Sequence, residues 1–214
     1  MVVVKNLTKT IKIKKEEKII LKNINLNCPD KGMVLIYGNS GCGKTTLLNI
    51  LEGLDKKYTG TVEILNKNIQ SIPDYKYLKN ISIIFQDCNF INGYTVLENI
   101  EIILRSKKIK FDPLLIETKL NQFKIKNLLY KRIEELSGGE KQILLLVLTQ
   151  FQTSKIVFCD EPTGSIDEEN ELIALKIIKE LAREKLVIVV SHNVALFLKH
   201  CDKAYYIEEG ELYD

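Results

Sequence analysis

A glycine-rich segment directly after a short apolar run constrains the fold of this chain most strongly. The run Met33 to Tyr37 has the length and composition of a buried strand, and it ends at Gly38. The loop GNSGCGKT follows, and the apolar residues of Lys44 to Glu52 then recur at helical spacing. A phosphate-binding loop requires this order of strand, glycine loop and helix. An ordinary glycine turn can occur without the strand and the helix. The segment therefore predicts a phosphate site at the end of a buried strand.

Each residue type in this loop has a chemical use. The glycines permit backbone conformations and close approaches that a side chain would block, so that backbone N–H groups point at phosphate. The following helix adds the positive end of its dipole, Lys44 adds a charge near the outer phosphates, and the Thr45 hydroxyl can bind Mg²⁺. The predicted nucleotide-binding residues here are Gly38, Asn39, Ser40, Gly41, Cys42, Gly43, Lys44, Thr45 and Thr46.

Two carboxylates stand at the end of a second apolar run. Residues 155–161 (KIVFCDE) predict a buried strand whose carboxyl end presents Asp160 and Glu161, and ligands of open parallel sheets bind at that end. Paired carboxylates can divide the work of nucleotide hydrolysis. Asp160 is the predicted Mg²⁺ ligand, through water, and Glu161 is the predicted base that polarises the water attacking the γ-phosphate.

Two more strands are expected to end in side chains that reach the same site. The strand Leu186 to Val190 is followed by His192. A lone histidine is more often structural, but its place at a strand end favours a γ-phosphate contact. Gln86 ends the strand Ile81 to Phe85 in the same manner, and its amide oxygen is expected to reach Mg²⁺ or the attacking water. The predicted catalytic residues are Glu161, His192, Gln86 and Lys44, and the predicted metal ligands are Thr45, Gln86 and Asp160.

The segment Leu136 to Glu140 (LSGGE) is a second glycine-rich helix start. Ser137 and Glu140 form a capping box, which gives the segment a purely structural reason to exist. A glycine-rich helix N-terminus also attracts phosphate, however, and the loop at Gly38 already supplies one such site. A second anion-binding terminus therefore suggests a second surface.

The rest of the chain predicts an α/β protein with a mostly parallel, doubly wound sheet, because strands alternate with helices. Two β-rich stretches, 2–7 and 19–26, come first, and the mixed-charge run 12–18 is expected to form a solvated turn between them. In the middle third, a capping box at Thr95 to Glu98 and the N-cap pair Asp112-Pro113 predict helix starts.

These helix starts predict a helical insertion at approximately 87–135. Together with the helix from Gly138, the insertion makes a helical subdomain of about 87–151. The expected organisation is a single domain, 1–214, in which residues 1–86 and 152–214 form the core and the β region.

Composition disfavours several classes of protein. The chain of 214 residues has 31 Lys and Arg against 28 Asp and Glu, a net charge of +3 without charged blocks, so nucleic-acid binding is not indicated. Its five cysteines lack CxxC spacing and are odd in number, which disfavours a disulfide framework or a zinc site and favours a reducing compartment. The longest apolar run, Ile143 to Leu148, is far shorter than the roughly 18 to 20 residues of a membrane span. If the chain serves transport, another polypeptide is expected to cross the membrane.

The motifs together resemble the ATP-binding-cassette (ABC) transporter ATPases over nearly the whole chain. In order they are the loop at Gly38, Gln86, LSGGE at Leu136, the pair Asp160-Glu161, residues 165–167 (SID) and His192. The resemblance implies a P-loop NTPase fold with a RecA-like, mostly parallel sheet, an N-terminal antiparallel β region and an inserted α-helical subdomain.

In that family the LSGGE-type motif closes over ATP bound by the opposite subunit. The resemblance therefore implies two ATP molecules, with Mg²⁺, sandwiched in a head-to-tail homodimer or heterodimer. Ser137, Gly138, Gly139 and Asp167 are then expected to contact the partner's ATP. It also implies an integral membrane permease as partner, no nucleic acid, and a cytoplasmic place on the inner face of the cell membrane.

Residues 160–167 (DEPTGSID) and 95–99 (TVLEN) are similar to a subgroup that contains lipoprotein-releasing, macrolide-exporting and antimicrobial-peptide transporter ATPases. This favours bacterial export of a peptide, lipoprotein or drug. The alternative is an ABC ATPase that regulates a non-transporting membrane complex of cell-division or sensor type. A cytosolic nucleic-acid ATPase is disfavoured because no basic stripe is present, and a P-loop kinase or GTPase leaves LSGGE unexplained.

Three positions depart from the family pattern. The chain has no aromatic residue before Tyr37 to stack on adenine, so Ile11 or Ile13 must serve, or no residue does. Ile143 and Leu148 stand where the helix after the signature usually carries arginines. Asn193 follows the histidine where an acidic residue is common.

Overall fold

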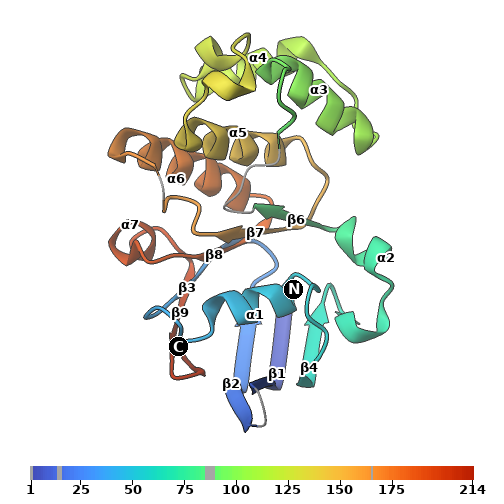
Figure 1. Ribbon diagram of the computed structural model, residues 1–214, viewed down its shortest axis with the longest axis vertical. Coiled ribbons are helices and arrows are strands. Elements are labelled where there is room, and N and C mark those ends of the chain that lie inside the picture. The colour runs from blue at the N-terminus through green and yellow to red at the C-terminus, as the bar shows by residue number, and fades with distance from the viewer. Residues whose placement is uncertain (1, 14–15, 85–89, 165) are drawn as a thin grey trace.

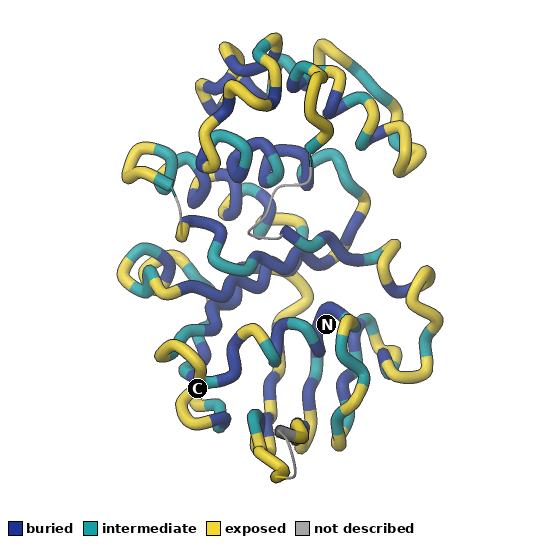
Figure 2. The backbone as a smooth tube through the Cα atoms, viewed as in Figure 1, coloured by how far each residue is buried: buried dark blue, intermediate teal, exposed yellow. Residues whose placement is uncertain are grey.

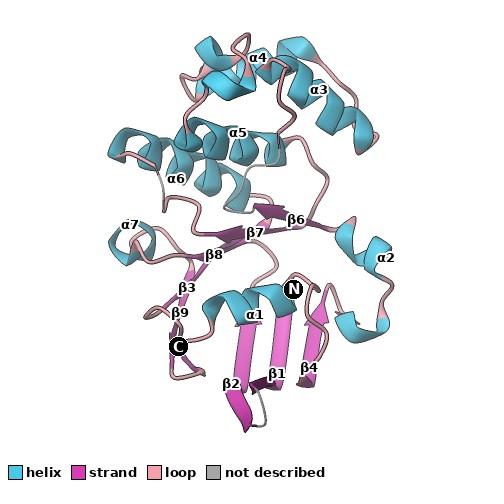
Figure 3. Ribbon diagram, in the orientation of Figure 1, coloured by secondary structure: helices cyan, strands magenta, loops and turns pink. Residues whose placement is uncertain are grey.

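The computed structural model describes residues 2–13, 16–84, 90–164 and 166–214. Gln86 and Ser165, which carry predictions above, lie outside this part of the chain. The described strands form two sheets, and helices cover both faces of the larger one (Figures 1 and 3).

The larger sheet has the strand order β10-β9-β3-β8-β7-β6. All neighbours in it pair in parallel except β10, which pairs antiparallel with β9 at the edge. The predicted mostly parallel sheet is thus confirmed. Its strands are β3 (Gly32–Tyr37), β6 (Ile81–Ile84), β7 (Ile156–Asp160), β8 (Leu186–Val190), β9 (Lys203–Glu208) and β10 (Glu211–Tyr213).

The smaller sheet is antiparallel and has the order β2-β1-β4-β5. Its strands are β1 (Val2–Ile13), β2 (Glu16–Cys28), β4 (Thr59–Ile64) and β5 (Lys67–Asn68). The prediction that the charged run 12–18 forms a turn is wrong in extent, because β1 and β2 continue into it and pair Ile11 with Lys18 and Lys12 with Glu17. Opposite charges on facing residues make this pairing favourable, and Lys12 Nζ lies 3.7 Å from Glu17 Oε1.

Side-chain caps mark the starts of the longer helices after α1, as the sequence predicted. Thr95 and Ser137 form capping boxes with Glu98 and Glu140, and Asp112 caps the helix that begins with Pro113. The helices are α1 (Lys44–Leu51), α2 (Asp74–Leu78), α3 (Val96–Ser106), α4 (Pro113–Gln122), α5 (Gly138–Gln150), α6 (Glu168–Ala182) and α7 (Val194–Leu198). Short 3₁₀ turns lie at 69–71, 126–128 and 133–135.

The large sheet separates two hydrophobic cores, because successive side chains of a strand point to opposite faces. Along β8, Val187 and Val189 face the core built with α3 to α6. Ile188 and Val190 face the core shared with α1 and the antiparallel sheet. The buried positions in Figure 2 accordingly run through the middle of the molecule on both sides of the sheet. The helix after the glycine loop and the helix after LSGGE therefore lie on opposite faces (Figure 1).

Ile143 and Leu148, which replace the family's arginines, are fully packed in the core under α5. Burial of two aliphatic side chains needs no charge partner, whereas a buried guanidinium does. The apolar contacts at both positions are consistent with the prediction that this helix face packs differently from that of the family.

Two charged side chains are buried at the far end of α1. Lys9 of β1 reaches across to Asp55, with 2.5 Å between Nζ and Oδ2, and donates to the Lys57 carbonyl, so it ties the antiparallel sheet to the segment after α1. The second buried charged side chain is that of Glu52, which is the C-cap of α1 and is only 2% exposed. Burial first, and then the Asp160 carboxylate, raise the pKa of Glu52 from 4.5 to about 8. The negative end of the helix dipole also disfavours a carboxylate at this position.

Glu52 should therefore make the stability of the chain depend on pH. Well below pH 4.5 both the folded and the unfolded chain hold the proton, so Glu52 adds no cost. Between pH 4.5 and about 8 only the unfolded chain releases it, so the free energy of unfolding falls as pH rises. We expect Glu52→Gln to be more stable than the wild type by roughly 2 to 4 kcal/mol at pH 8 and nearly equal to it at pH 5. Urea unfolding at both pH values measures this, with exposed Glu16→Gln as control, and equal gains at both pH values would contradict the assignment.

Candidate nucleotide-binding site

A cavity of about 330 Å³ opens where the glycine loop, the start of α1 and the carboxyl ends of β7 and β8 meet. Strand pairing aligns the carboxyl ends of β3, β7 and β8, because Val190 lies opposite both Ile36 and Asp160. The lining residues are Ile20, Ser40, Gly41, Gly43, Lys44, Thr45, Thr46, Asp160, Glu161, Val190 and His192. The structure thus brings most of the predicted phosphate, metal and catalytic groups together. A larger cavity, of about 530 Å³, lies between α2 and the end of α3 and is lined by none of them.

Glycine is required at two places in the loop. Gly38 has a φ of 155°, and a Cβ there would lie 2.1 Å from the Ile207 carbonyl oxygen. Gly43 has a φ of 111° at the N-cap of α1, and a Cβ there would lie 2.7 Å from a methyl group of Leu21. Side chains at either position would displace the loop from β2 and β9, so the sequence has a steric reason for both glycines.

Lys44 is 6% exposed, and its ammonium group is held by the loop itself. Its Nζ donates to the carbonyl oxygens of Gly38 at 2.9 Å and Asn39 at 2.8 Å. These neutral acceptors are weaker partners for an ammonium group than phosphate oxygens. An incoming polyphosphate can therefore draw the amine into the cavity.

Asp160 and Thr45 supply oxygen atoms to the same cavity. Burial, followed by the adjacent Glu161 carboxylate, raises the pKa of Asp160, and Lys44 and His192 partly oppose this rise. Burial and mutual repulsion make it costly for both carboxylates to carry a negative charge. A cation bound beside them would lower this cost. Within the described residues, no group of three or more His, Cys, Asp or Glu side chains could hold a metal ion. One hydroxyl and one carboxylate fit Mg²⁺, which keeps several waters and is bound with substrate phosphates.

Glu161 is held in a strained backbone conformation, with a φ of 46°. Such a left-handed residue other than glycine costs on the order of 1 kcal/mol or more and persists only where its surroundings enforce it. The Glu161 N–H donates to the Val190 carbonyl at 2.9 Å, and the His192 N–H donates to Glu161 Oε2 at 3.2 Å. The other carboxylate oxygen, Oε1, is buried and has no hydrogen-bond donor in good geometry among the described residues, although His192 Nε2 lies 3.3 Å away. A buried acceptor of this kind fits a water molecule.

The LSGGE segment does not contribute to this cavity. Ser137 caps α5, Gly138 is exposed, and a Cβ on Gly139 would lie 2.8 Å from Ile166 Cγ2. Asp167 caps α6 by accepting from the N–H of Asn170 at 2.9 Å. Neither Asp167 nor the three signature residues line the cavity that holds Lys44. Helices α5 and α6, which begin at these residues, lie on the other face of the large sheet from α1 (Figure 1).

Sequence reasoning missed residues that complete the site. Ile20 of β2 lines the cavity, although apolar alternation along a strand carries no sign of such a role. Ile11, one of the two predicted substitutes for the aromatic residue, is exposed and does not line it, and the side chain of Ile13 lies outside the described part of the structure. The long-range hydrogen bond between Asn193 Nδ2 and Glu171 Oε1, at 2.9 Å, also escaped prediction.

The profile of the ABC transporter family matches residues 21–164 of the chain. The chain belongs to the ABC transporter family. It is an ATPase, and it is the ATP-driven subunit of an ABC transporter. Among the described residues, no helix is long and apolar enough to cross a membrane.

Named relatives of this ABC ATPase agree with the predicted subgroup. The lipoprotein-releasing system ATP-binding protein LolD of Wigglesworthia glossinidia brevipalpis is 36% identical, over 98% of this chain and 94% of LolD. The macrolide export ATP-binding/permease protein MacB of Haemophilus ducreyi is 30% identical, over 90% of this chain but 29% of MacB.

A solved structure matches the fold. It is the dimeric, post-hydrolysis state of the ATP-binding cassette MJ0796 bound to ADP and Pi. Its TM-score is 0.84 at 30% identity, over 100% of this chain and 97% of that one. The α/β P-loop NTPase fold predicted from the sequence is thereby confirmed.

Nucleobase selection should be weak in this ABC ATPase, because no aromatic side chain among the described residues lines the cavity. We expect fluorescent analogues of ATP and GTP to bind with similar Kd values, and Ile11→Tyr to tighten binding about fivefold or more, since base stacking contributes roughly 1 to 3 kcal/mol. Ile19→Tyr, another exposed isoleucine replaced on the neighbouring strand, is the control. A strong preference of the wild type for ATP would contradict this expectation.

Proposed function

We propose that two ATP-bound subunits close around two nucleotides and that hydrolysis reopens them, which drives a separate membrane permease. The observation that carries this proposal is the separation of the two anion-binding elements. The glycine loop lines the cavity with Lys44, whereas Ser137 and the exposed Gly138 lie on another surface of the same chain. A helix N-terminus that attracts phosphate but does not line the site of its own chain is suited to the site of a second subunit.

The residues of the cavity have distinct roles in this proposal. Backbone N–H groups of residues 38–46 hold the phosphates, and Lys44 leaves the carbonyls of Gly38 and Asn39 to bind the outer ones. When bound by Thr45, Asp160 and Gln86, Mg²⁺ supplies neutralising charge to the phosphate oxygens. Glu161 accepts a proton from the attacking water at Oε1, and His192, 3.3 Å from that oxygen, contacts the γ-phosphate.

The transport direction is proposed from the relatives. LolD and MacB are named for lipoprotein release and macrolide export, and LolD aligns with 98% of this chain. We therefore favour extraction or export of a lipoprotein, peptide or drug over the regulation of a non-transporting membrane complex. We accordingly propose that the subunit binds its permease at the cytoplasmic face of the membrane.

The proposed permease contact lies within residues 86–99, of which the structure describes Phe90 to Asn99. Asn99 is fully buried and organises this loop. Its Oδ1 accepts from the Ile91 N–H at 2.7 Å, and its Nδ2 donates to the carbonyls of Ile91 and Thr95. The side chains of Ile91 and Tyr94 are left 45% exposed by this arrangement. A rigid loop that presents two exposed apolar side chains is suited to a protein contact.

Glu161→Gln should abolish ATP turnover and leave ATP binding intact. The amide keeps the size of the side chain but cannot accept the proton, and loss of the base costs about 100-fold or more in rate. Phosphate release and fluorescent-nucleotide binding measure the two effects separately. Exposed Glu184→Gln is the matched control, and undiminished hydrolysis by Glu161→Gln would remove Glu161 from the role of base.

The double variant Ile91→Ser/Tyr94→Ser should lose the permease while its ATPase site stays folded. Affinity purification of the tagged subunit from its native membranes, with mass spectrometry, measures the multi-span protein that accompanies it. Leu114→Ser/Tyr130→Ser, which alters side chains that are 73% and 70% exposed elsewhere in the same helical region, is the control. Equal recovery of the permease with both double variants would place the contact elsewhere, and recovery of only soluble partners by the wild type would contradict the transport proposal.

A further inference from the structure

The residue after the switch histidine is fixed in orientation by two hydrogen bonds. Asn193 Oδ1 accepts from the Leu196 N–H at 3.3 Å and so caps α7. Because the carbonyl oxygen of the amide is used there, its NH₂ group must point the other way. It donates to Glu171 Oε1 at 2.9 Å. Asn193 therefore joins the first turns of two helices, α7 and α6.

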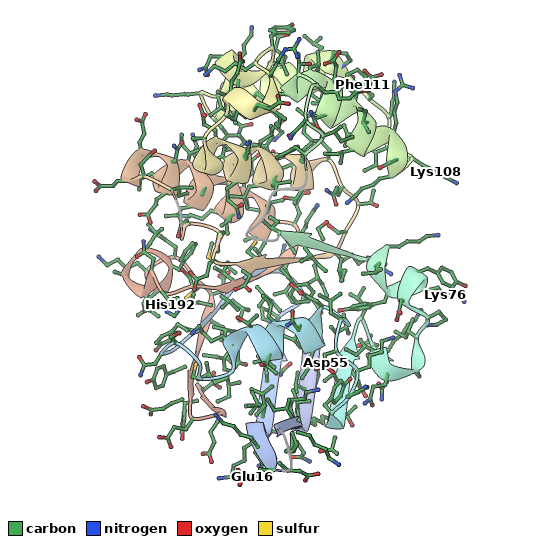
Figure 4. All side chains as sticks on the ribbon, in the orientation of Figure 1. Glu16, Asp55, Lys76, Lys108, Phe111 and His192 are labelled. Atoms are coloured by element: carbon green, nitrogen blue, oxygen red, sulfur yellow. The ribbon has the colours of Figure 1, made fainter. Side chains whose placement is uncertain are left out.

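The residue before the histidine is anchored to the catalytic strands. Ser191 is fully buried, and its N–H donates to the Ile36 carbonyl at 3.4 Å. Its hydroxyl accepts from the Asn193 N–H at 3.0 Å and donates to Glu161 Oε2 at 3.4 Å. His192 thus lies between two anchored neighbours, whereas its own side chain is 55% exposed and lies beside α7 (Figure 4). The position of the imidazole depends on the backbone that Ser191 and Asn193 hold.

Glu171 lies one helical turn after Asp167, the N-cap of α6, and its N–H donates to the Asp167 carbonyl at 2.9 Å. The residue before that cap, Ile166, packs against Gly139 of the signature helix. A continuous set of contacts therefore runs from the signature surface through Ile166 and α6 to Glu171, and from there to Asn193.

We propose that Glu171 and Asn193 are a positioning pair that holds His192 against Glu161 and ties it to the helix that begins beside the signature. This inference rests on the proposed roles of Glu161 and His192. Neither member of the pair touches the nucleotide cavity, so both act through the histidine. An amide is needed at position 193 because a carboxylate there would face the carboxylate of Glu171.

Asn193→Asp tests the pair without removing the cap, since aspartate also caps helices well. We expect kcat to fall by roughly tenfold or more, because small displacements of a catalytic group cost about that much. KM for ATP and the thermal midpoint should change little. In Asn193→Asp/Glu171→Gln the glutamine can donate to the new aspartate, so most of the lost kcat should return. Glu171→Ala, which removes the acceptor without adding a charge, should also lower kcat, and exposed Glu169→Gln on the same helix should not.

The outcomes are distinct. Wild-type kcat in Asn193→Asp and Glu171→Ala, or no recovery of kcat in the double variant, overturns the positioning pair. An equal loss of ATP binding and kcat in Asn193→Asp also overturns it, since the pair would then act on the cavity and not on His192. If the wild-type chain itself hydrolyses no ATP, the proposed function fails instead, and the two failures are therefore distinguishable.

Discussion

The alternation of side chains across the large parallel sheet is the constraint on which the rest of the structure depends. Each central strand supplies apolar residues to both faces, so helices must cover both. On one face α1 follows the glycine loop, and on the other α5 follows the signature. The signature residues at the start of α5 do not line the cavity that holds Lys44. This arrangement leaves the signature free for the nucleotide of a second subunit, as proposed above.

Much of the fold could be predicted from the sequence because its signals are local. The capping boxes at Thr95 and Ser137 and the proline after Asp112 each depend on neighbours within a few residues. The carboxyl ends of parallel strands also meet at one edge by geometry alone, so Asp160, Glu161 and His192 could be placed together before any coordinates were known. The short helix α2 and the edge strand β10 carry weaker local signals and were not predicted.

The features that were missed are tertiary. Burial of Glu52 and the bond between Lys9 and Asp55 arise where the antiparallel sheet meets the end of α1. The bond between Glu171 and Asn193 joins two helices that no short motif connects. The strained backbone of Glu161 has no sequence signal either, because a left-handed glutamate is imposed by its surroundings. The catalytic and binding roles of the site residues, Gln86 and Ser165 among them, and the boundary of the helical subdomain stay predictions.

If each ATP site is shared by two chains, ATP must double the mass of the protein in solution. Light scattering on Glu161→Gln, which should hold ATP without consuming it, measures this mass with and without nucleotide. We predict a species of 24.6 kDa without ATP and one of twice that mass with ATP. Adding Ser137→Arg to the same variant should return the monomer, because a bulky side chain at the signature blocks the partner's nucleotide. A mass that stays at 24.6 kDa with saturating ATP, or a dimer that survives Ser137→Arg, would contradict the account.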